Sequence, residues 1–400
     1  MITNALNRKI YLDHSATTPL DERVFCEMKP WFTEKFGNAN SIHSFGADAA
    51  LAVDTARRKI AELLGAKPTE IYFTSGGTEA DNWAIKGMAE AKRDKGKHII
   101  VSSIEHAAIM SACKQLSAKG YEITYLPVNS KGLVAPQDLL SAIRNDTVMV
   151  SVMLANNEVG TIQPIKELCE IAHGKGVLFH TDAVQAVGSI PVSVKELGVD
   201  MLSLSAHKFY GPKGIGALYI KSGVKPDKLL VGGHQERTMR GGTTNVPAVV
   251  GMAKALEIAT GELKKNSEYV KGLRDRFVKL VEERIPHVIY NGDGKERLPQ
   301  NANFSFEFIE GEALLLNLDL CGIACSSGSA CSSGSLEPSH VLLAMGINPE
   351  TAHGSIRFSF GKDNTRDEVD YVVEKLVENV NKLRAISPLF AMFNEGVKNV

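Results

Sequence analysis

The stretch Ile71-Tyr-Phe-Thr-Ser-Gly-Gly-Thr-Glu-Ala-Asp-Asn82 contains the unit on which the fold is built. Residues 71–74 have strand character, a Ser-Gly-Gly turn follows, and a helical pattern runs from Thr78 to Glu90. Glycines let the backbone curl and a helix start offers unpaired N–H groups, so this turn could hold a phosphate. It matches neither a Walker loop nor a Gly-x-Gly-x-x-Gly motif. The alternative is an ordinary strand-to-helix turn capped by Thr78.

The same alternation of strand and helix extends from about residue 50 to residue 220. Apolar runs predict further strands at 98–101, 122–126, 148–154, 177–180 and 201–204, with helices near 105–118, 136–144 and 165–174. Buried-type strands that alternate with helices indicate an α/β fold around a mainly parallel sheet. Ligands of such sheets bind at the loops that leave the carboxyl ends of the strands. We therefore expect the functional residues just after each strand.

The pattern changes after residue 220. A long amphipathic stretch at about 247–285 precedes a mixture of predicted strands, at 288–290, 303–308 and 355–360, and predicted helices, near 311–320 and 366–384. A mixture of this kind is typical of a smaller α+β domain.

Composition excludes several classes of function. Of the 400 residues, 44% are hydrophobic and 23% are charged, and the net charge of −1 gives no sign of binding to nucleic acid or to an anionic membrane. The six cysteines are too few for a disulfide scaffold in a chain of this length. Neither a signal peptide nor an apolar run of the roughly 18 residues that span a bilayer is evident. We expect a cytoplasmic protein with reduced thiols.

Two charged side chains directly follow predicted strands. Lys208 comes after the strand at 201–204, and a lysine in a low-dielectric pocket becomes an amine nucleophile. A lysine whose stem lies along apolar surface is the simpler interpretation. Asp182 follows the strand at 177–180, where a carboxylate would keep a ring nitrogen protonated. A helix N-cap is the alternative for Asp182.

Three more polar residues stand at comparable positions. His106, after the strand at 98–101, can stack on a ring or move protons, and Asn157, after the strand at 148–154, can bond a phenolic oxygen. Both could equally be structural. Arg357 lies between apolar residues and needs a carboxylate, either structural or from a substrate. With the phosphate turn, Lys208 and Asp182, this set fits pyridoxal phosphate better than any other cofactor. No His/Cys cluster has zinc spacing, so no metal site is expected.

A different feature is the Ser/Gly-rich run Ser326-Ser-Gly-Ser-Ala-Cys-Ser-Ser-Gly-Ser335, which carries Cys331. Such a run has almost no apolar surface to bury, so we expect a mobile loop with an exposed thiol. Composition alone leaves two interpretations open. The run is either a flexible linker that happens to carry a cysteine or a moving arm that carries a nucleophile.

These residues belong to an ordered series of motifs by which the chain resembles the NifS/IscS-type cysteine desulfurases, which are fold-type I, pyridoxal-phosphate-dependent enzymes of the class V aminotransferase family. The resemblance runs essentially from end to end. The motifs are Ile10-Tyr-Leu-Asp-His-Ser-Ala-Thr-Thr18, Phe36-Gly-Asn-Ala-Asn-Ser-Ile-His43, 74–82, Asn156-Asn-Glu-Val-Gly160, His180-Thr-Asp-Ala-Val-Gln185, Ser205-Ala-His-Lys208, Gly232-Gly-His-Gln-Glu-Arg237, Gly328-Ser-Ala-Cys331, Leu336-Glu-Pro-Ser-His340 and Ile356-Arg-Phe-Ser359.

The resemblance implies a fold and a set of partners. It implies a homodimer with a large domain over 18–262, built on a mainly parallel sheet of the seven-stranded type. The small α+β domain would comprise 1–17 and 263–400 and carry the mobile Cys331 loop. The activity would convert L-cysteine to L-alanine and pass sulfur, held as a persulfide on Cys331, to an iron–sulfur scaffold protein or another acceptor.

The resemblance also implies a role for each candidate residue. Lys208 would be the Schiff-base lysine that also removes the Cα proton. His106 would stack on the ring and assist proton transfer, and we take it as the candidate for handling thiol protons. Cys331 would accept sulfur and could transiently ligate a cluster on a partner. The remaining implied contacts are Asp182 with the pyridine nitrogen, Asn157 and Gln185 with the phenolic side, Gly77, Thr78, Ser205, His207 and Thr243 of the partner subunit with the phosphate, and Asn157 and Arg357 with the substrate.

Some positions depart from the family pattern, and rival functions stay open. Cys325 stands where a small residue is expected, and Cys321 precedes it by four positions, so each is either a core thiol or part of a sulfur relay. The segment 383–389 looks more like the nitrogen-fixation branch than the housekeeping branch. A selenocysteine lyase or an aminotransferase of the same fold, or a non-catalytic scaffold for sulfur-transfer proteins, are the alternatives.

Overall fold

The computed structural model describes residues 9–327 and 337–398. Its largest element is a seven-stranded sheet in the order β2-β8-β7-β6-β5-β3-β4. Every neighbouring pair from β7 to β4 is parallel, while β8 runs antiparallel to both β2 and β7. The strands are β2 (Ile71–Thr74), β3 (His98–Ser102), β4 (Glu122–Leu126), β5 (Thr147–Ser151), β6 (Leu178–Asp182), β7 (Met201–Ser205) and β8 (Gly216–Ile220).

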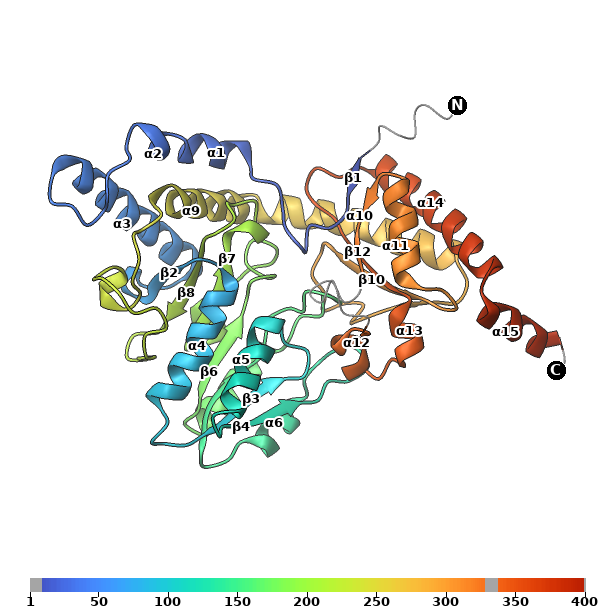
Figure 1. Cartoon of the computed structure of the whole chain (residues 1–400), viewed down its shortest axis with the longest axis horizontal. Coiled ribbons are helices and arrows are strands. Elements are labelled where there is room, and N and C mark those ends of the chain that lie inside the picture. The colour runs from blue at the N-terminus through green and yellow to red at the C-terminus, as the bar shows by residue number, and fades with distance from the viewer. Residues whose placement is uncertain (1–8, 328–336, 399–400) are drawn as a thin grey trace.

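Helices cover both faces of this sheet (Figure 1). On one face, α4 (Gly77–Ala91) and α5 (Ala107–Ser117) pack on strand residues such as Ile99 and Val101. On the other face, Ile100 packs in a core formed with α3 (Ser44–Leu64), α6 (Pro136–Ala142), α7 (Ile165–Gly174) and α9 (Val246–Gly261). Successive residues of a buried strand face opposite sides, which explains the continuous apolar runs in the sequence. Three short helices complete this part: α1 (Glu22–Met28), α2 (Pro30–Thr33) and α8 (Val194–Leu197).

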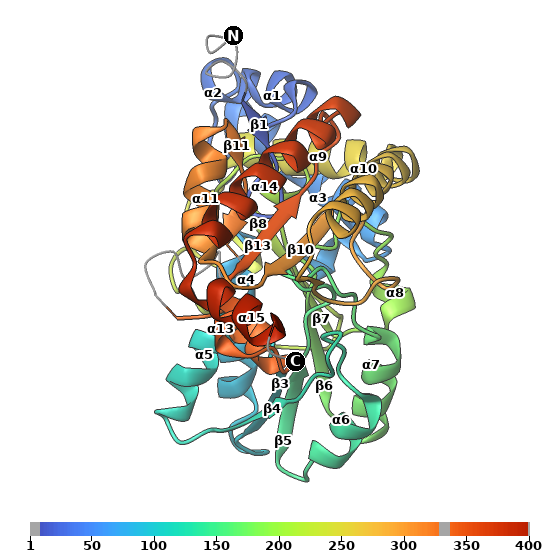
Figure 2. The same ribbon diagram turned by 90° about the vertical axis from the view of Figure 1, so that its right-hand side faces the viewer.

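A second core surrounds a four-stranded sheet in the order β12-β13-β10-β9, in which all neighbours are antiparallel. Its strands are β9 (Val288–Tyr290), β10 (Asn301–Phe306), β12 (Ser326–Ser327) and β13 (Ser355–Ser359). Side chains of α10 (Leu263–Arg284), α11 (Gly311–Leu320) and α14 (Arg366–Ala385) pack on it. Figure 2 shows α10, α11 and α14 around this sheet, with α15 (Pro388–Lys398) at the end of the chain.

The N-terminal segment of the described chain belongs to this second part. β1 (Ile10–Tyr11) pairs in parallel with β11 (Ile323–Ala324), and the buried side chains of Ile10 and Leu12 belong to its core. The helices α9 and α10 follow one another across the molecule, with only Glu262 between them, and so connect the two parts (Figure 1). Two short helices, α12 (His340–Ala344) and α13 (Pro349–His353), pack on the loops that follow β3 and β5.

The α/β fold class and the mainly parallel sheet expected from the sequence are confirmed, and most boundaries fall within two residues of prediction. One expectation was wrong in extent. The strand predicted at 148–154 ends at Ser151, although the N–H groups of Val152 and Leu154 still donate to carbonyl groups of β6. The amphipathic stretch at 247–285 forms the two helices α9 and α10. The boundaries of the two domains stay a prediction, and no helix in the described ranges is long and apolar enough to cross a membrane.

Candidate active site

One cavity at the carboxyl ends of the parallel strands collects most of the side chains that the sequence singled out. Its lining includes all the predicted cofactor and substrate contacts of the described chain except Thr243. Those residues are Gly77, Thr78, His106, Asn157, Asp182, Gln185, Ser205, His207, Lys208 and Arg357. Ser15, Ala16, Asp81, Met153 and Val184 complete the lining. The carboxyl ends of the strands are where ligands of α/β sheets bind, so the topology explains the meeting of residues far apart in sequence.

The turn between β2 and α4 presents backbone N–H groups to this cavity. Gly76 caps α4 without any side-chain bond, so the first N–H groups of the helix are open to an anion. A Cβ atom at Gly77 would lie 2.7 Å from Cγ2 of Val184, so only glycine fits here without movement. Thr78, Ser205 and His207 add hydroxyl and imidazole groups around the same turn. This donor set suits a phosphate group.

Asp182, at the end of β6, is 5% exposed and provides the carboxylate of the site. Its Oδ1 accepts the N–H of Val184 at 2.8 Å. Burial raises the pKa of Asp182, and His106 and Lys208 act in the opposite direction. A protonated ring nitrogen placed against Asp182 would stabilise the ionised form, so the carboxylate fits the pyridine of pyridoxal phosphate.

A second buried carboxyl, Asp81, lies beside Asp182. Asp81 is 1% exposed, and its Oδ1 has no hydrogen-bond partner among the described residues. Burial and the charge of Asp182 raise the pKa of Asp81 well above its usual range. The ring of His180 lies 3.8 Å from Asp81 and is held between the hydroxyls of Ser151 and Ser203, at 2.8 and 3.0 Å. Two carboxylates in one buried site disfavour double ionisation, so Asp81 holds a proton while Asp182 is the charged member.

His106 caps the helix that follows β3. Its Nδ1 accepts the backbone N–H of Ala108 at 3.2 Å, and because an amide can only donate, the neutral ring carries its proton on Nε2. Burial lowers the pKa of His106, and Lys208 and His340 add to this effect against the opposing charge of Asp182. At neutral pH the ring is therefore an uncharged N–H donor.

Glu105, the residue before His106, is completely buried. Its Oε1 accepts the hydroxyl of Ser102 at 2.5 Å and the N–H of Met153 at 2.8 Å, and its Oε2 has no partner in the described part of the chain. Burial raises the pKa of Glu105 to about 8. The carboxyl group therefore ties the ends of β3 and β5 together in its neutral form.

Lys208 stands on the short turn after β7 and reaches the N-terminal segment. Its Nζ donates to the carbonyl oxygens of Ser15 at 2.5 Å and Ala16 at 2.8 Å. Gln185 Nε2 donates to the same Ser15 oxygen at 2.9 Å. The amine is thus held in the cavity that also contains Asp182 and the phosphate turn, which is the position that a covalent anchor of pyridoxal phosphate requires.

Arg357, at the centre of β13, brings a positive charge from the second sheet into the same cavity. The side chain is 2% exposed. Nη1 donates to the carbonyl of Asn157 at 3.0 Å and Nη2 to Asp13 Oδ1 at 2.9 Å. The sequence left open whether Arg357 meets a structural carboxylate or that of a substrate, and the structure shows the carboxylate of Asp13 in contact with it. A buried guanidinium at the wall of a cavity also suits the carboxylate of a substrate.

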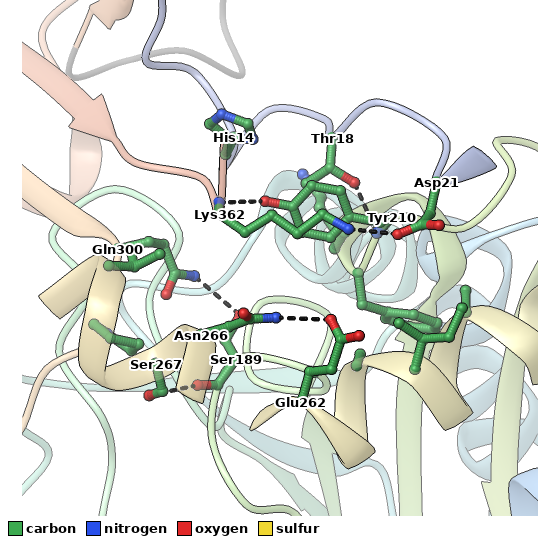
Figure 3. A pocket seen from close by; sticks show the side chains of 18 of the residues that line it. His14, Thr18, Asp21, Ser189, Tyr210, Glu262, Asn266, Ser267, Gln300 and Lys362 are labelled. Atoms are coloured by element: carbon green, nitrogen blue, oxygen red, sulfur yellow. Dashed lines mark hydrogen bonds and ion pairs between the residues drawn. The ribbon is translucent and has the colours of Figure 1, made fainter. Parts of the chain in front are cut away.

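On the other side of Lys208 and Gln185, a second cavity lies where the two parts of the molecule meet (Figure 3). Lys362 closes one wall, since its side chain pairs with Asp21 and its N–H donates to Tyr210 Oη at 3.0 Å. Gln300 Nε2 donates to the hydroxyl of Ser189 at 3.1 Å on the opposite wall. These bonds join the residues just after β13 and just before β10 to the part of the molecule built on the large sheet, and so help to fix Arg357 relative to Lys208.

Two predicted site residues are not part of the cavity. Thr243 is exposed on the loop before α9 and does not line the cavity of its own chain. Cys331 lies outside the described residues. The five described cysteines are free thiols. Burial raises the pKa of Cys113 and Cys169 to about 12 and also raises that of Cys325, so these three remain protonated at neutral pH.

The sequence assigned no role to Asp81 and Ser15, which line the cavity, or to Asp13, which contacts Arg357. Asp81 was part of a quoted motif but had no role, because nothing in a helical pattern shows that a carboxyl points inward. Ser15 contributes through its backbone carbonyl, which every residue has. Asp13 meets Arg357 across 344 positions of sequence. Only its place inside the first motif could have drawn attention to it.

The chain is similar to known proteins over almost its whole length. The family model described as "Aminotransferase class-V" matches residues 10–372. The cysteine desulfurase IscS of Dictyoglomus turgidum is 55% identical over 383 residues, which cover 96% of this chain and 97% of that protein. The IscS of Methanosarcina thermophila is also 55% identical over 383 residues, covering 96% of this chain and 95% of its own.

Solved structures show the same relationship. A structure described as a NifS-like protein superposes with a TM-score of 0.89 at 42% identity and covers 94% of this chain and all of its own. A structure of SspA in complex with cysteine gives a TM-score of 0.80 at 36% identity, with coverage of 89% and 100%.

Proposed function

We propose how the residues of this chain, which belongs to the class-V aminotransferase family and within it is a cysteine desulfurase, carry out the reaction. The family depends on pyridoxal phosphate, and we propose that this chain binds it. The observation that carries the proposal is the single cavity that holds Lys208, Asp182, the turn at Gly77 and Arg357. The contacts proposed for the cofactor are Lys208 as covalent anchor, Asp182 at the ring nitrogen, His106 on the ring face, Asn157 and Gln185 at the phenolic oxygen, and Gly77, Thr78, Ser205 and His207 at the phosphate.

When bound, pyridoxal phosphate supplies an electron sink for the carbon that carries the amino group. The protein residues have separate tasks. Arg357 binds the carboxylate of L-cysteine, with Asn157 beside it, and so orients the substrate. Lys208 accepts and returns the proton at Cα. The neutral ring of His106 donates its Nε2 proton, because Nδ1 is occupied by the N–H of Ala108.

The sulfur step is assigned to Cys331. Its thiolate attacks the sulfur of the substrate, an S–S bond forms, the C–S bond breaks, and the electron pair stays with the carbon, which takes up a proton. The balance is L-cysteine plus thiol giving L-alanine plus a persulfide on Cys331. An ordinary thiol with a pKa near 8.5 needs help to ionise, so a proton acceptor must act at this step. His106 is the proposed acceptor, but because its Nδ1 is occupied by the N–H of Ala108, it can take the thiol proton only on Nε2, after that nitrogen has given up its own proton. Unchanged turnover in His106→Gln would remove His106 from thiol proton transfer.

We propose that the working unit is a homodimer. Large apolar side chains are exposed on and beside the helices α1–α3, namely Phe32, Phe36, Ile42, Phe45 and Leu51, and Val231 is 85% exposed. Exposed apolar groups gathered in this way mark protein interfaces. Thr243 of the partner subunit would complete the phosphate site. The free thiols of the described cysteines support a reducing, cytoplasmic location.

The proposed destination of the sulfur is an iron–sulfur scaffold protein or another acceptor that takes it from the persulfide. The names of the IscS relatives support this direction. The experiment that tests the function is incubation of the protein with pyridoxal phosphate and L-cysteine. Equal yields of L-alanine and reducible sulfur are expected. Amino transfer to an added keto acid without sulfur release would favour an aminotransferase. Faster turnover of L-selenocysteine than of L-cysteine would favour a selenocysteine lyase. If no product forms, a non-catalytic scaffold is the remaining interpretation.

A further inference from the structure

The segment Asp13–Ala16 connects the two cationic groups of the active site. At one end, the side chain of Asp13 pairs with Arg357. At the other end, the carbonyl groups of Ser15 and Ala16 accept the Nζ protons of Lys208. The segment itself is fixed to β13, because the N–H of Ser15 donates to Ser359 Oγ at 2.8 Å. A charge placed on Asp13 therefore acts on a rigid part of the site.

The guanidinium of Arg357 is only partly satisfied. Its contacts are the Asn157 carbonyl and Asp13 Oδ1, and its Nε has no partner in the described ranges. Glu158 also lies near Arg357, but burial raises the pKa of Glu158 to about 7 and so disfavours its charged form, and its side chain contacts Ser339. Asp13 is thus the main counter-charge of Arg357.

Asp13 has a second donor. Ser326 Oγ donates to the same Oδ1 at 2.9 Å, and Ser326 lies directly opposite Arg357 in the pairing of β12 with β13. Asp13 Oδ1 is therefore shared between a neutral hydroxyl and a buried cation. Removing the hydroxyl leaves more of the carboxylate for the guanidinium.

We propose that, before the substrate binds, the carboxylate of Asp13 occupies the position on Arg357 that the substrate carboxylate would take. Asp13 thereby sets the affinity of the site for the carboxylate of its amino-acid substrate. The proposal rests on the function assigned to Arg357 above. A substrate carboxylate must share or replace the contact with Asp13, because two anions on one guanidinium repel each other. Asp13 thereby weakens carboxylate binding while it keeps a buried arginine neutralised before the substrate arrives.

The test uses the holoenzyme and two ligands that differ only in the carboxylate, L-alanine and ethylamine. Binding is followed by the change in the visible absorbance of the cofactor and by the thermal shift, so no turnover is needed. Asp13→Asn keeps an oxygen that accepts from Arg357 but removes the charge. We expect its Kd for L-alanine to fall about tenfold, the size of a charge-assisted contact of about 1.4 kcal/mol, with the Kd for ethylamine unchanged.

Ser326→Ala is the companion variant. It should change the Kd for L-alanine in the opposite direction, and it leaves both charges of the Asp13–Arg357 pair in place. It releases Asp13 for Arg357, so we expect the Kd for L-alanine to rise about twofold to threefold, again without an effect on ethylamine. Asp13→Glu keeps the charge and should not tighten binding. An Asp13→Asn protein that binds L-alanine no better than the wild type would overturn the proposal, and so would an unchanged Kd in Ser326→Ala. A wild type that responds to neither ligand would instead contradict the proposed function.

Discussion

Asp182 and Asp81 are identical side chains whose surroundings give them different protonation states. Both are almost fully buried, but Asp182 faces His106 and Lys208 whereas Asp81 faces the neutral ring of His180. The charged role therefore falls to Asp182. The sequence predicted Asp182 because a strand ends there. It could not predict Asp81, since the inward direction of a helical residue depends on which sheet face the helix covers.

The raised pKa of Glu105 predicts a pH-dependent stability. The carboxyl group titrates near pH 4.5 when unperturbed and near pH 8 in the folded protein. Between these values the folded protein holds a proton that the unfolded chain has released, so the free energy of unfolding falls as the pH rises, by about 1.4 kcal/mol per pH unit for one such group. Glu105→Gln should remove this slope. Denaturant unfolding at about pH 6 and about pH 7.5 measures it, and an equal loss of stability in wild type and variant contradicts the assignment.

The cysteines give a prediction about sulfur transfer. Cys331→Ala should retain the visible absorbance of the bound cofactor but lose nearly all sulfide production. Cys325→Ala is the matched control, because burial keeps the Cys325 thiol protonated and a thiol is a poor nucleophile. We expect Cys325→Ala to retain most of the activity, measured as sulfide released per minute. Loss of activity in this control would restore the sulfur relay through Cys325.

Among the elements, the strand-to-helix turn was predicted best from the sequence. The strand, turn and helix over 71–90 were predicted almost residue by residue, because strand character, glycines and a helical period follow one another there. The antiparallel strand β8 was not predicted, although it fills a central place in the sheet. The helix α3 was not assigned either. The neighbours of a strand are set by contacts between distant segments, which local patterns do not contain.

The tight fit of the turn at Gly77 predicts that a larger residue there weakens cofactor binding. A methyl group at Gly77 would lie 2.7 Å from Val184, so Gly77→Ala must displace the turn or the strand end. Overpacking of about 1–3 kcal/mol would weaken pyridoxal phosphate binding by about tenfold to a hundredfold. Fluorescence titration of the apoprotein with the cofactor measures this affinity.

Gly272→Ala is the control for that measurement. Gly272 lies within α10, and nothing approaches its Cβ position within 4 Å. The substitution should raise the free energy of unfolding by up to about 1 kcal/mol through helix propensity and leave the cofactor affinity unchanged. Equal cofactor affinities for Gly77→Ala and Gly272→Ala would contradict the proposed phosphate site.

At the scale of the whole molecule, the site forms where two separately packed cores meet. One core supplies Lys208 and Asp182, and the other supplies Arg357. The sequence predicts two parts because their mixtures of strand and helix differ. Local patterns do not show that the N-terminal strand β1 joins the second part, although this pairing places Asp13 beside Arg357.

The exposed apolar side chains near α1–α3 predict association of whole chains. Sedimentation equilibrium of the wild type should give twice the chain mass of 43.3 kDa. Replacing Phe36 and Ile42 by aspartate places charges in the proposed interface, so we expect dissociation and, because Thr243 of the partner subunit would be lost, weaker retention of the cofactor. A monomeric wild type, or a double variant that remains dimeric, contradicts this interface.

The most direct test of the desulfurase mechanism is one turnover of the holoenzyme with a single equivalent of L-cysteine and no acceptor, followed by mass spectrometry of the intact chain and of its Cys331 peptide. The proposed mechanism predicts one L-alanine per active site and one added sulfur atom on Cys331, removed by reductant and absent in Cys331→Ala. Formation of L-alanine with the added sulfur on another cysteine, or with free sulfide in the Cys331→Ala protein, would contradict it.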